Sequence, residues 1–509
     1  MKAAGVYSPR GCYNPSPMDY AALMVRAEEF YEEMALEYFN HFAGLSEDFR
    51  LVEIVGRYPE LFSRETYNAA MATVPPGVSD RELRLLRNFL TGNLFTAELK
   101  GLVEKKEKKE AALTVRQGGR EIPYRALPPT VANEPDARVR RELDAAGVAA
   151  LDLEVNPLYR RIFEETIRLT QELGYSSYTE MVRTLTGIPL EQLHQHLLAF
   201  LDESEDLYFD ALEEYAGSLL GLGLDELEQC DAGYLFRADR FDGLFPAEKM
   251  VGALRETLLG LGIDLDAQEN VTLDLESRPR KTPRAFCIGV RVPEDVRLVI
   301  SPQGGVQDYQ ALFHEAGHLE FSAHMSARLP FLFRQEGDTT VHESYAFLMQ
   351  YLTTDQVWLS EMLGAEDTEE FLRFSRFNKL YMLRRYAAKL DYEFTFWPRP
   401  KLDAAGELYT DRLTRAVGFK YRPERALADF DENYYVAKYL QAWMAEAAIR
   451  CHLKLDYGED WFLNPDAGDW LRELWRDGMK HDIRELMAMN NWPDLNYRPM
   501  LDDIADWLA

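Results

Sequence analysis

The stretch ALFHEAGHLEF, residues 311–321, predicts an apolar α-helix with two histidines on one face. His314 and His318 are four residues apart, and side chains at that spacing lie one above the other on a helix. They could be ordinary polar residues, but two histidines in an apolar setting without a partner are costly. A bound metal ion removes that cost. We therefore expect both histidines to be metal ligands, with Glu315 beside the open coordination position as general base.

A catalytic zinc ion usually takes three protein ligands, so a third is expected nearby. The segment FRQEGDTTVHESYAFLMQYL (333–352) offers Glu343, 25 residues after the second histidine, inside a predicted helix. Asp338 precedes that helix and has the position of an N-cap. We predict Glu343 as the third ligand, with Asp338 and Glu336 as alternatives, in a zinc site within 308–352. Two further histidines are expected to be structural or exposed: His324 and His342.

Around this motif the chain has the pattern of a mostly α protein. Apolar residues recur at intervals of three and four from about residue 18 to 110 and again after 136. The segment 116–135 is rich in Gly and Pro and predicts a connecting loop. Residues 284–301 form two β-rich runs around PED, which predicts a small β-ribbon beside the motif helix. We expect one catalytic unit over 1–509, either undivided or composed of two helical lobes, an N-terminal part (1–135) and a catalytic part (136–509).

The composition and net charge limit the kinds of partner that we expect for this protein. The 509 residues carry a formal net charge of −29, which argues against nucleic acid or an anionic membrane surface as a partner. The sequence contains no apolar run of 18 residues, the length that would predict a transmembrane helix. The first 20 residues lack the apolar core of a secretory signal. Four widely spaced cysteines are typical of free thiols, so we expect a cytoplasmic protein.

The motif and its spacing resemble known zinc peptidases. LFHEAGH followed by a glutamate 25 residues after the second histidine resembles the thimet oligopeptidase and oligoendopeptidase F family. HEAGHLEF…LP…RQEGDTTVHES also resembles the zinc-site segment of angiotensin-converting enzyme-like peptidases. Both groups are gluzincins. The resemblance implies a large helical body split by a deep substrate groove, one Zn²⁺ ion, and short peptides that bind by β-addition to the strand within 284–301.

The resemblance further implies a C-terminal tyrosine cluster that stabilises the oxyanion. The candidate segment is FDENYYVAKYLQAW (430–443), in which Tyr435 and Tyr439 share one helix face. Tyrosines at this spacing are also common in cores and groove walls. The families carry a substrate-binding histidine just upstream of the tyrosines, whereas residues 400–433 of this chain contain no histidine. Arg422 or Arg425 is the candidate to replace it.

The function expected from these features is zinc-dependent hydrolysis of short peptides in the manner of an oligoendopeptidase. One alternative is a converting-enzyme-like carboxypeptidase or dipeptidase. That activity needs a cationic anchor for the terminal carboxylate, which the sequence does not identify. The other alternative is a non-catalytic, zinc-stabilised peptide-binding protein.

Overall fold

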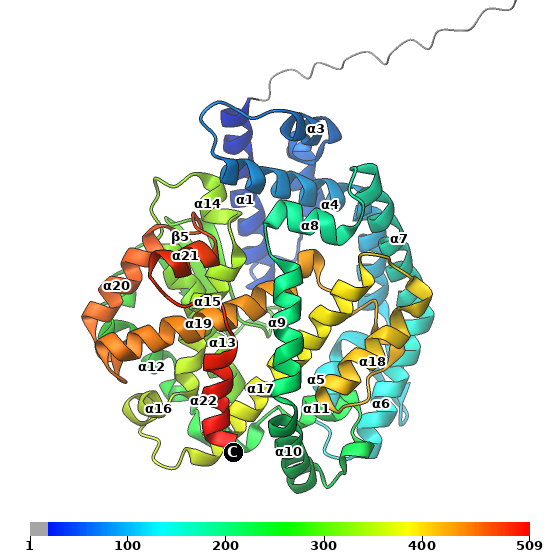
Figure 1. Cartoon of the computed structure of the whole chain (residues 1–509), viewed down its shortest axis with the longest axis vertical. Coiled ribbons are helices and arrows are strands. Elements are labelled where there is room, and N and C mark those ends of the chain that lie inside the picture. The colour runs from blue at the N-terminus through cyan, green and yellow to red at the C-terminus, as the bar shows by residue number, and fades with distance from the viewer. Residues whose placement is uncertain (1–18, 509) are drawn as a thin grey trace, which may run out of the picture.

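Helices account for most of the fold, as the sequence predicts (Figure 1). The structure is a computed structural model that describes residues 19–508. Cys12 lies outside this range. Most of the first 20 residues, where the sequence predicts no secretory signal, also lie outside it. The N-terminal part contains α1 (Tyr20–Phe42), α2 (Leu51–Arg57), α3 (Arg64–Ala72) and α4 (Asp80–Ala112), then β1 (Thr114–Gln117), β2 (Arg120–Pro123) and α5 (Leu127–Ala132).

The middle of the chain is helical up to a small sheet. Its helices are α6 (Ala137–Ala150), α7 (Asn156–Glu172), α8 (Tyr178–Thr186), α9 (Leu190–Glu203), α10 (Glu205–Tyr215), α11 (Gln229–Leu235) and α12 (Ala247–Gly260). The strands that follow are β3 (Val271–Asp274), β4 (Phe286–Arg291) and β5 (Asp295–Val299).

The last part contains the predicted motif. Its helices are α13 (Val306–Ala323), α14 (Phe331–Gln335), α15 (Thr339–Gln350), α16 (Gln356–Leu363), α17 (Glu369–Phe396), α18 (Ala405–Val417), α19 (Tyr435–Tyr457), α20 (Pro465–Arg476), α21 (Ile483–Met489) and α22 (Arg498–Leu508). Helix α15 packs against both α13 and α19 near the middle of the molecule (Figure 1).

The segment predicted as a connecting loop over 116–135 is instead largely structured, and that prediction is wrong. Strands β1 and β2 pair as an antiparallel hairpin. Gly118 and Gly119 form its turn with φ values of 57° and 77°. Two successive positive φ angles match the right-handed twist of the flanking strands, and glycine adopts them without steric cost. Helix α5 follows, with prolines in its first turn.

The predicted β-ribbon is confirmed and is larger than expected. Strands β4 and β5 are antiparallel, and β3 adds to the other side of β5 in a parallel arrangement, so the order is β3-β5-β4. Strand β4 is therefore an edge strand. Helices α1 and α13 both contact it. The parallel pairing was not expected, because it joins two segments separated in sequence by β4.

Among the described residues, buried apolar side chains form a main core and three smaller clusters, one of them in the N-terminal helices. The main core extends from Phe163 to Leu508. Helices α1 to α4 have a separate cluster, completed by Phe331, Leu332 and Phe333 of α14. Because α14 joins α13 to α15, the N-terminal helices are anchored on the connection between the two helices that carry the predicted metal ligands.

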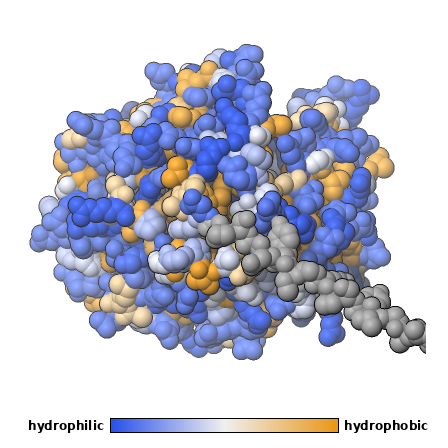
Figure 2. All heavy atoms as spheres, turned by 90° about the horizontal axis from the view of Figure 1, so that it is seen from above, coloured by the Kyte–Doolittle hydropathy of each residue, from blue (hydrophilic) through white to orange (hydrophobic). Residues whose placement is uncertain are grey.

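The surface is mostly polar. Figure 2 shows hydrophilic residues over much of the face seen from above, with hydrophobic ones scattered among them. Within residues 19–508, no helix has both the length and the apolar character needed to span a bilayer.

Candidate metal centre and adjoining cavity

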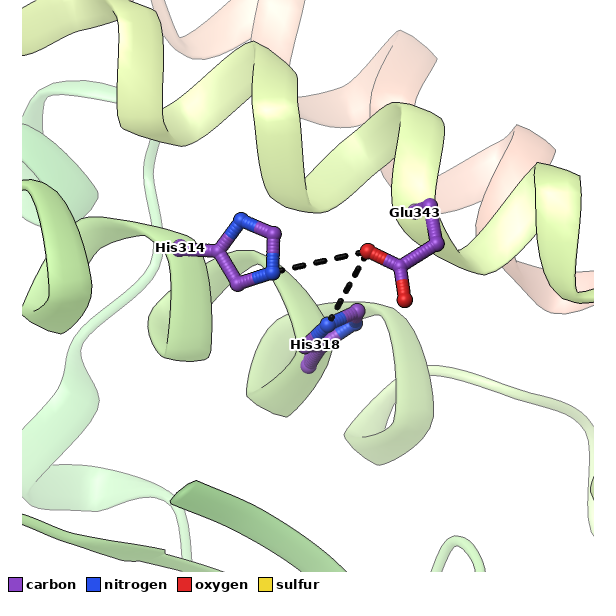
Figure 3. Close-up of side chains that lie close together, drawn as sticks. All are labelled: His314, His318 and Glu343. Carbon is purple, nitrogen blue, oxygen red and sulfur yellow. Dashed lines mark ion pairs between the residues drawn. The ribbon is translucent and has the colours of Figure 1, made fainter. Parts of the chain in front are cut away.

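Three predicted ligands converge at one point between α13 and α15. Figure 3 shows the rings of His314 and His318 on the same side of α13, facing the carboxylate of Glu343. The Oε2 atom of Glu343 lies 3.4 Å from Nε2 of His314 and 3.7 Å from Nε2 of His318. The three ligand atoms all lie within 4.8 Å of one another and form a group that could hold a metal ion.

The geometry and chemistry of this group fit a divalent ion. Metal–ligand bonds of 2.0–2.1 Å in a tetrahedron place the ligand atoms about 3.4 Å apart, close to the separations from Glu343 Oε2. That oxygen is buried and has no hydrogen-bond partner. A buried carboxylate oxygen without a hydrogen-bond donor is costly, and a bound cation would remove the cost.

Protonation of the ligands follows from burial and from their neighbours. Burial lowers the pKa of His318, which keeps its ring in the neutral form that binds metals. Burial also opposes protonation of His314, but Glu343, with smaller contributions from Glu315 and Gln350, outweighs burial and raises the pKa. The pKa of Glu343 is lowered despite burial, because His314 and Tyr435 stabilise its charged form.

Neighbouring side chains orient both histidines. The Oε1 atom of Gln350 lies 2.9 Å from Nδ1 of His314, so the amide oxygen accepts the ring N–H and leaves Nε2 free for a metal. Nδ1 of His318 contacts His342, whose other ring nitrogen lies 3.3 Å from the hydroxyl group of Ser322. His342 thus supports a ligand, and it is not part of the ligand group.

The two alternative ligands, Asp338 and Glu336, do not belong to the ligand group. Asp338 is the N-cap of α15, as predicted, and accepts hydrogen bonds from the backbone N–H groups of Thr340 and Ile483, both at 3.0 Å. His324 bonds to the carbonyl oxygen of Glu320 at the end of α13.

Glu315 lies between the metal ligands and the edge strand β4. The backbone N–H of Cys287 donates a 2.7 Å hydrogen bond to Oε2 of Glu315. This N–H therefore faces α13 and not β5, and the outer edge of β4 borders the site. Burial raises the pKa of Glu315.

Both predicted tyrosines lie near the ligand group. The hydroxyl group of Tyr435 donates a 2.6 Å hydrogen bond to Oε1 of Glu343. The ring of Tyr439 lies 4.9 Å from that of Tyr435, in an edge-on arrangement, and lines a cavity. Tyr435 is thus a direct partner of the carboxylate ligand, while Tyr439 faces the open space beside it.

This cavity has a volume of about 610 Å³ and reaches from the motif helix to α17, α19 and α22. His314 and Glu315 line one part of it. The two arginines considered as substitutes for the missing histidine are elsewhere. Arg422 binds Glu228 at 2.7 Å and Arg425 binds Asp144, and neither lines the cavity.

Sequence reasoning missed several residues of the site. Gln350 lies seven residues after Glu343, so a helical projection from that glutamate could have found it. Gly317 lies inside the motif helix, where glycine costs about 1 kcal/mol relative to alanine and so indicates a packing requirement. The Cys287 N–H leaves no signal in the sequence. A scan of protein-family models finds no match to the chain, and a search of curated proteins finds none either.

Proposed function

We propose that this chain is a zinc-dependent peptidase that hydrolyses short peptides. The observation that carries the proposal is the convergence of His314, His318 and Glu343 around a buried carboxylate oxygen that accepts no hydrogen bond, with Glu315 beside them at the cavity. Two imidazoles and one carboxylate are a donor set typical of catalytic zinc, which keeps one position open.

Each residue has a defined part in the reaction. A bound zinc ion would act as a Lewis acid toward water and the scissile carbonyl group. Oε2 of Glu315 is held by the Cys287 N–H, which leaves Oε1 to take a proton from the attacking water and deliver it to the leaving amine. Tyr435 bonds to the carboxylate of Glu343 and Tyr439 packs against Tyr435 at the cavity, and we assign both phenols to the negative charge that develops on the carbonyl oxygen.

Substrate alignment is part of the same proposal. Strand β4 is an edge strand whose Cys287 N–H bonds to Glu315, and an extended peptide can add to an edge strand through main-chain hydrogen bonds. Among the described residues, Cys230, Cys287 and Cys451 are free thiols. This supports a reducing compartment, and we propose the cytoplasm.

The test is mass spectrometry of a mixed peptide pool incubated with the zinc-loaded protein and with its Glu315→Gln variant. We expect cleavage by the wild type alone, with equal zinc content in both proteins. The fragment ends would distinguish internal cleavage from removal of C-terminal residues. An intact pool in the presence of stoichiometric zinc would reject the peptidase proposal and favour a zinc-stabilised peptide-binding protein.

A further inference from the structure

The wall of the cavity away from the motif helix is rich in cations. Arg376 and Lys379 of α17 and Arg450 of α19 line the same cavity as Glu315. This concentration of positive charge stands out in a chain with a net charge of −29. A local positive region inside an acidic protein favours an anionic ligand over a neutral one at that position.

The three cations have too few carboxylate partners. Lys379 and Arg450 share the buried carboxylate of Glu446, at 3.3 Å and 2.7 Å. Among the described residues, Asp503 is the carboxylate that pairs with Arg376, at 3.5 Å from Nε and without a hydrogen bond. Two negative charges therefore face three positive ones, and the group keeps an excess positive charge.

Other carboxylates do not correct this imbalance. Asp355 also lines the cavity, but it binds Lys454 at 2.8 Å. Lys454 also binds Glu459 at 2.7 Å, and because the side chain of Glu459 is 66% exposed, water screens most of its charge. The remaining fixed partner of Arg376 is neutral: its Nη1 atom donates to the carbonyl oxygen of Thr354 at 2.7 Å.

Burial makes the excess charge energetically significant. The side chains of Arg376 and Lys379 are only 12% and 8% exposed. Burial, together with the nearby arginines, lowers the pKa of Lys379 to about 8 even though Glu446 opposes this effect. Nε of Arg376 is buried without an acceptor. A buried cation without a full complement of acceptors is stabilised when an anion binds.

An aromatic wall connects the cations with the metal ligands. The rings of His314 and Phe347 are 5.2 Å apart, those of Phe347 and Tyr351 are 5.9 Å apart, and Nζ of Lys379 lies 3.7 Å from the Tyr351 ring. All four residues line the cavity. Lys379 is therefore no more than about 15 Å from His314, which is about four residues of extended peptide at ~3.3 Å each.

We propose that Arg376, Lys379 and Arg450 bind a carboxylate of the peptide substrate, supplied by its C-terminus or by an acidic side chain within about four residues of the cleaved bond. The inference rests on the proposed peptidase function and adds a specificity to it. A terminal carboxylate bound here would place the cleaved bond at a fixed short distance from the substrate's C-terminus, so the products would include C-terminal fragments of about four residues or fewer.

The experiment measures equilibrium binding to the zinc-loaded Glu315→Gln variant, in which peptides stay intact. Three probes are compared: acetyl-Ala-Ala-Phe-Ala-Ala as the free acid, the same peptide as the C-terminal amide, and acetyl-Ala-Ala-Phe-Ala-Glu amide. The acid should bind at least about tenfold more tightly than the amide, the size expected for one charge-assisted hydrogen bond. If the glutamate amide matches the acid, a side chain is an equally good source of the carboxylate.

Substitutions test whether a preference for the free-acid peptide depends on the three cations. Lys379→Met, added to Glu315→Gln, should reduce the preference for the acid severalfold or more, and Lys379→Arg should retain it. Lys389→Met is the matched control, because Lys389 lies on the same helix, is 7% exposed, binds Asp431 at 2.8 Å and does not line the cavity. Arg450→Gln is a second test should Lys379→Met fail to fold, as judged by thermal unfolding.

The outcomes separate this inference from the peptidase proposal. Equal binding of all three probes, or a preference that survives both Lys379→Met and Arg450→Gln, would overturn the carboxylate site while leaving zinc-dependent cleavage untouched. A preference lost in these variants would support the site even if the wild-type protein cleaved no peptide.

Discussion

Gly317→Ala tests whether the close approach of two helices assembles the metal site. A Cβ atom at Gly317 would lie 2.6 Å from both Cα of Ala346 and the carbonyl oxygen of Tyr345, which are backbone atoms of α15. Ordinary van der Waals contact begins at 3.4 Å. Since backbone cannot move aside as a flexible side chain can, α13 and α15 would have to separate by about 0.8 Å.

This separation is large compared with the tolerance of a metal site. Gly317 lies on the helix that carries both proposed histidine ligands, and α15 carries Glu343. Ligand distances in metal sites hold to about ±0.2 Å, so a shift of this size should weaken zinc binding by about 10–100-fold. Overpacking costs about 1–3 kcal/mol of folding free energy. The helix propensity of alanine returns about 1 kcal/mol, so the net effect on stability is a loss of up to about 2 kcal/mol.

The assay is competition for zinc with a chromophoric chelator, combined with thermal unfolding of the metal-free protein. The matched control is Gly92→Ala in α4, where an added Cβ would meet nothing within 4 Å. That control should stabilise the protein by up to about 1 kcal/mol and leave zinc affinity unchanged. If Gly317→Ala behaved like the control in both measurements, the assembly of the site by close helix packing would be refuted.

Three further substitutions test separate parts of the site. Tyr435→Phe removes the hydroxyl group that donates to Glu343, so turnover and zinc affinity should both fall, the latter by about tenfold or more; unchanged zinc affinity in a chelator titration would contradict this. Gln350→Ala removes the acceptor that orients His314 and should weaken zinc binding by about 10–100-fold without unfolding the protein, which calorimetric titration can check. Burial raises the pKa of Glu336 from 4.5 to about 8, so the folded state retains this proton at pH values where the unfolded chain loses it. The free energy of unfolding therefore falls as the pH rises through this window, by up to about 1.4 kcal/mol per pH unit. The melting temperature of Glu336→Gln relative to that of the wild type should therefore increase as the pH is raised from 5 to 8. A difference that stays constant over this range would reject the raised pKa of Glu336.

Features that depend on neighbours in sequence were predicted well. The two histidines follow from helical spacing, and Asp338 follows from its position before a helix, because both depend on contacts within one or two turns. The choice of Glu343 required one tertiary assumption, that its face of the helix points inward; the geometry of the ligand group agrees with it.

Features that depend on distant segments were not predictable in this way. The parallel pairing of β3 with β5 and the cations of the cavity wall each depend on contacts between elements that are not adjacent in the sequence. The β1–β2 hairpin is a different case, since its two-glycine turn between short β-rich runs is a local signal. It was overlooked because Gly and Pro nearby also match the composition of a loop.

A single stripe of α15 unites most of the site. The residues of this stripe are Glu343, Ala346, Phe347 and Gln350. Their spacing of three, four and seven residues places them on one helix face, which packs on α13. They supply a ligand oxygen, the close contact with Gly317, a ring 5.2 Å from that of His314, and the acceptor for its Nδ1–H. Because these contacts share one helix interface, Gly317→Ala and Gln350→Ala should lower zinc affinity non-additively when combined. Additive losses would mean that Gln350 orients His314 independently of how closely the helices approach.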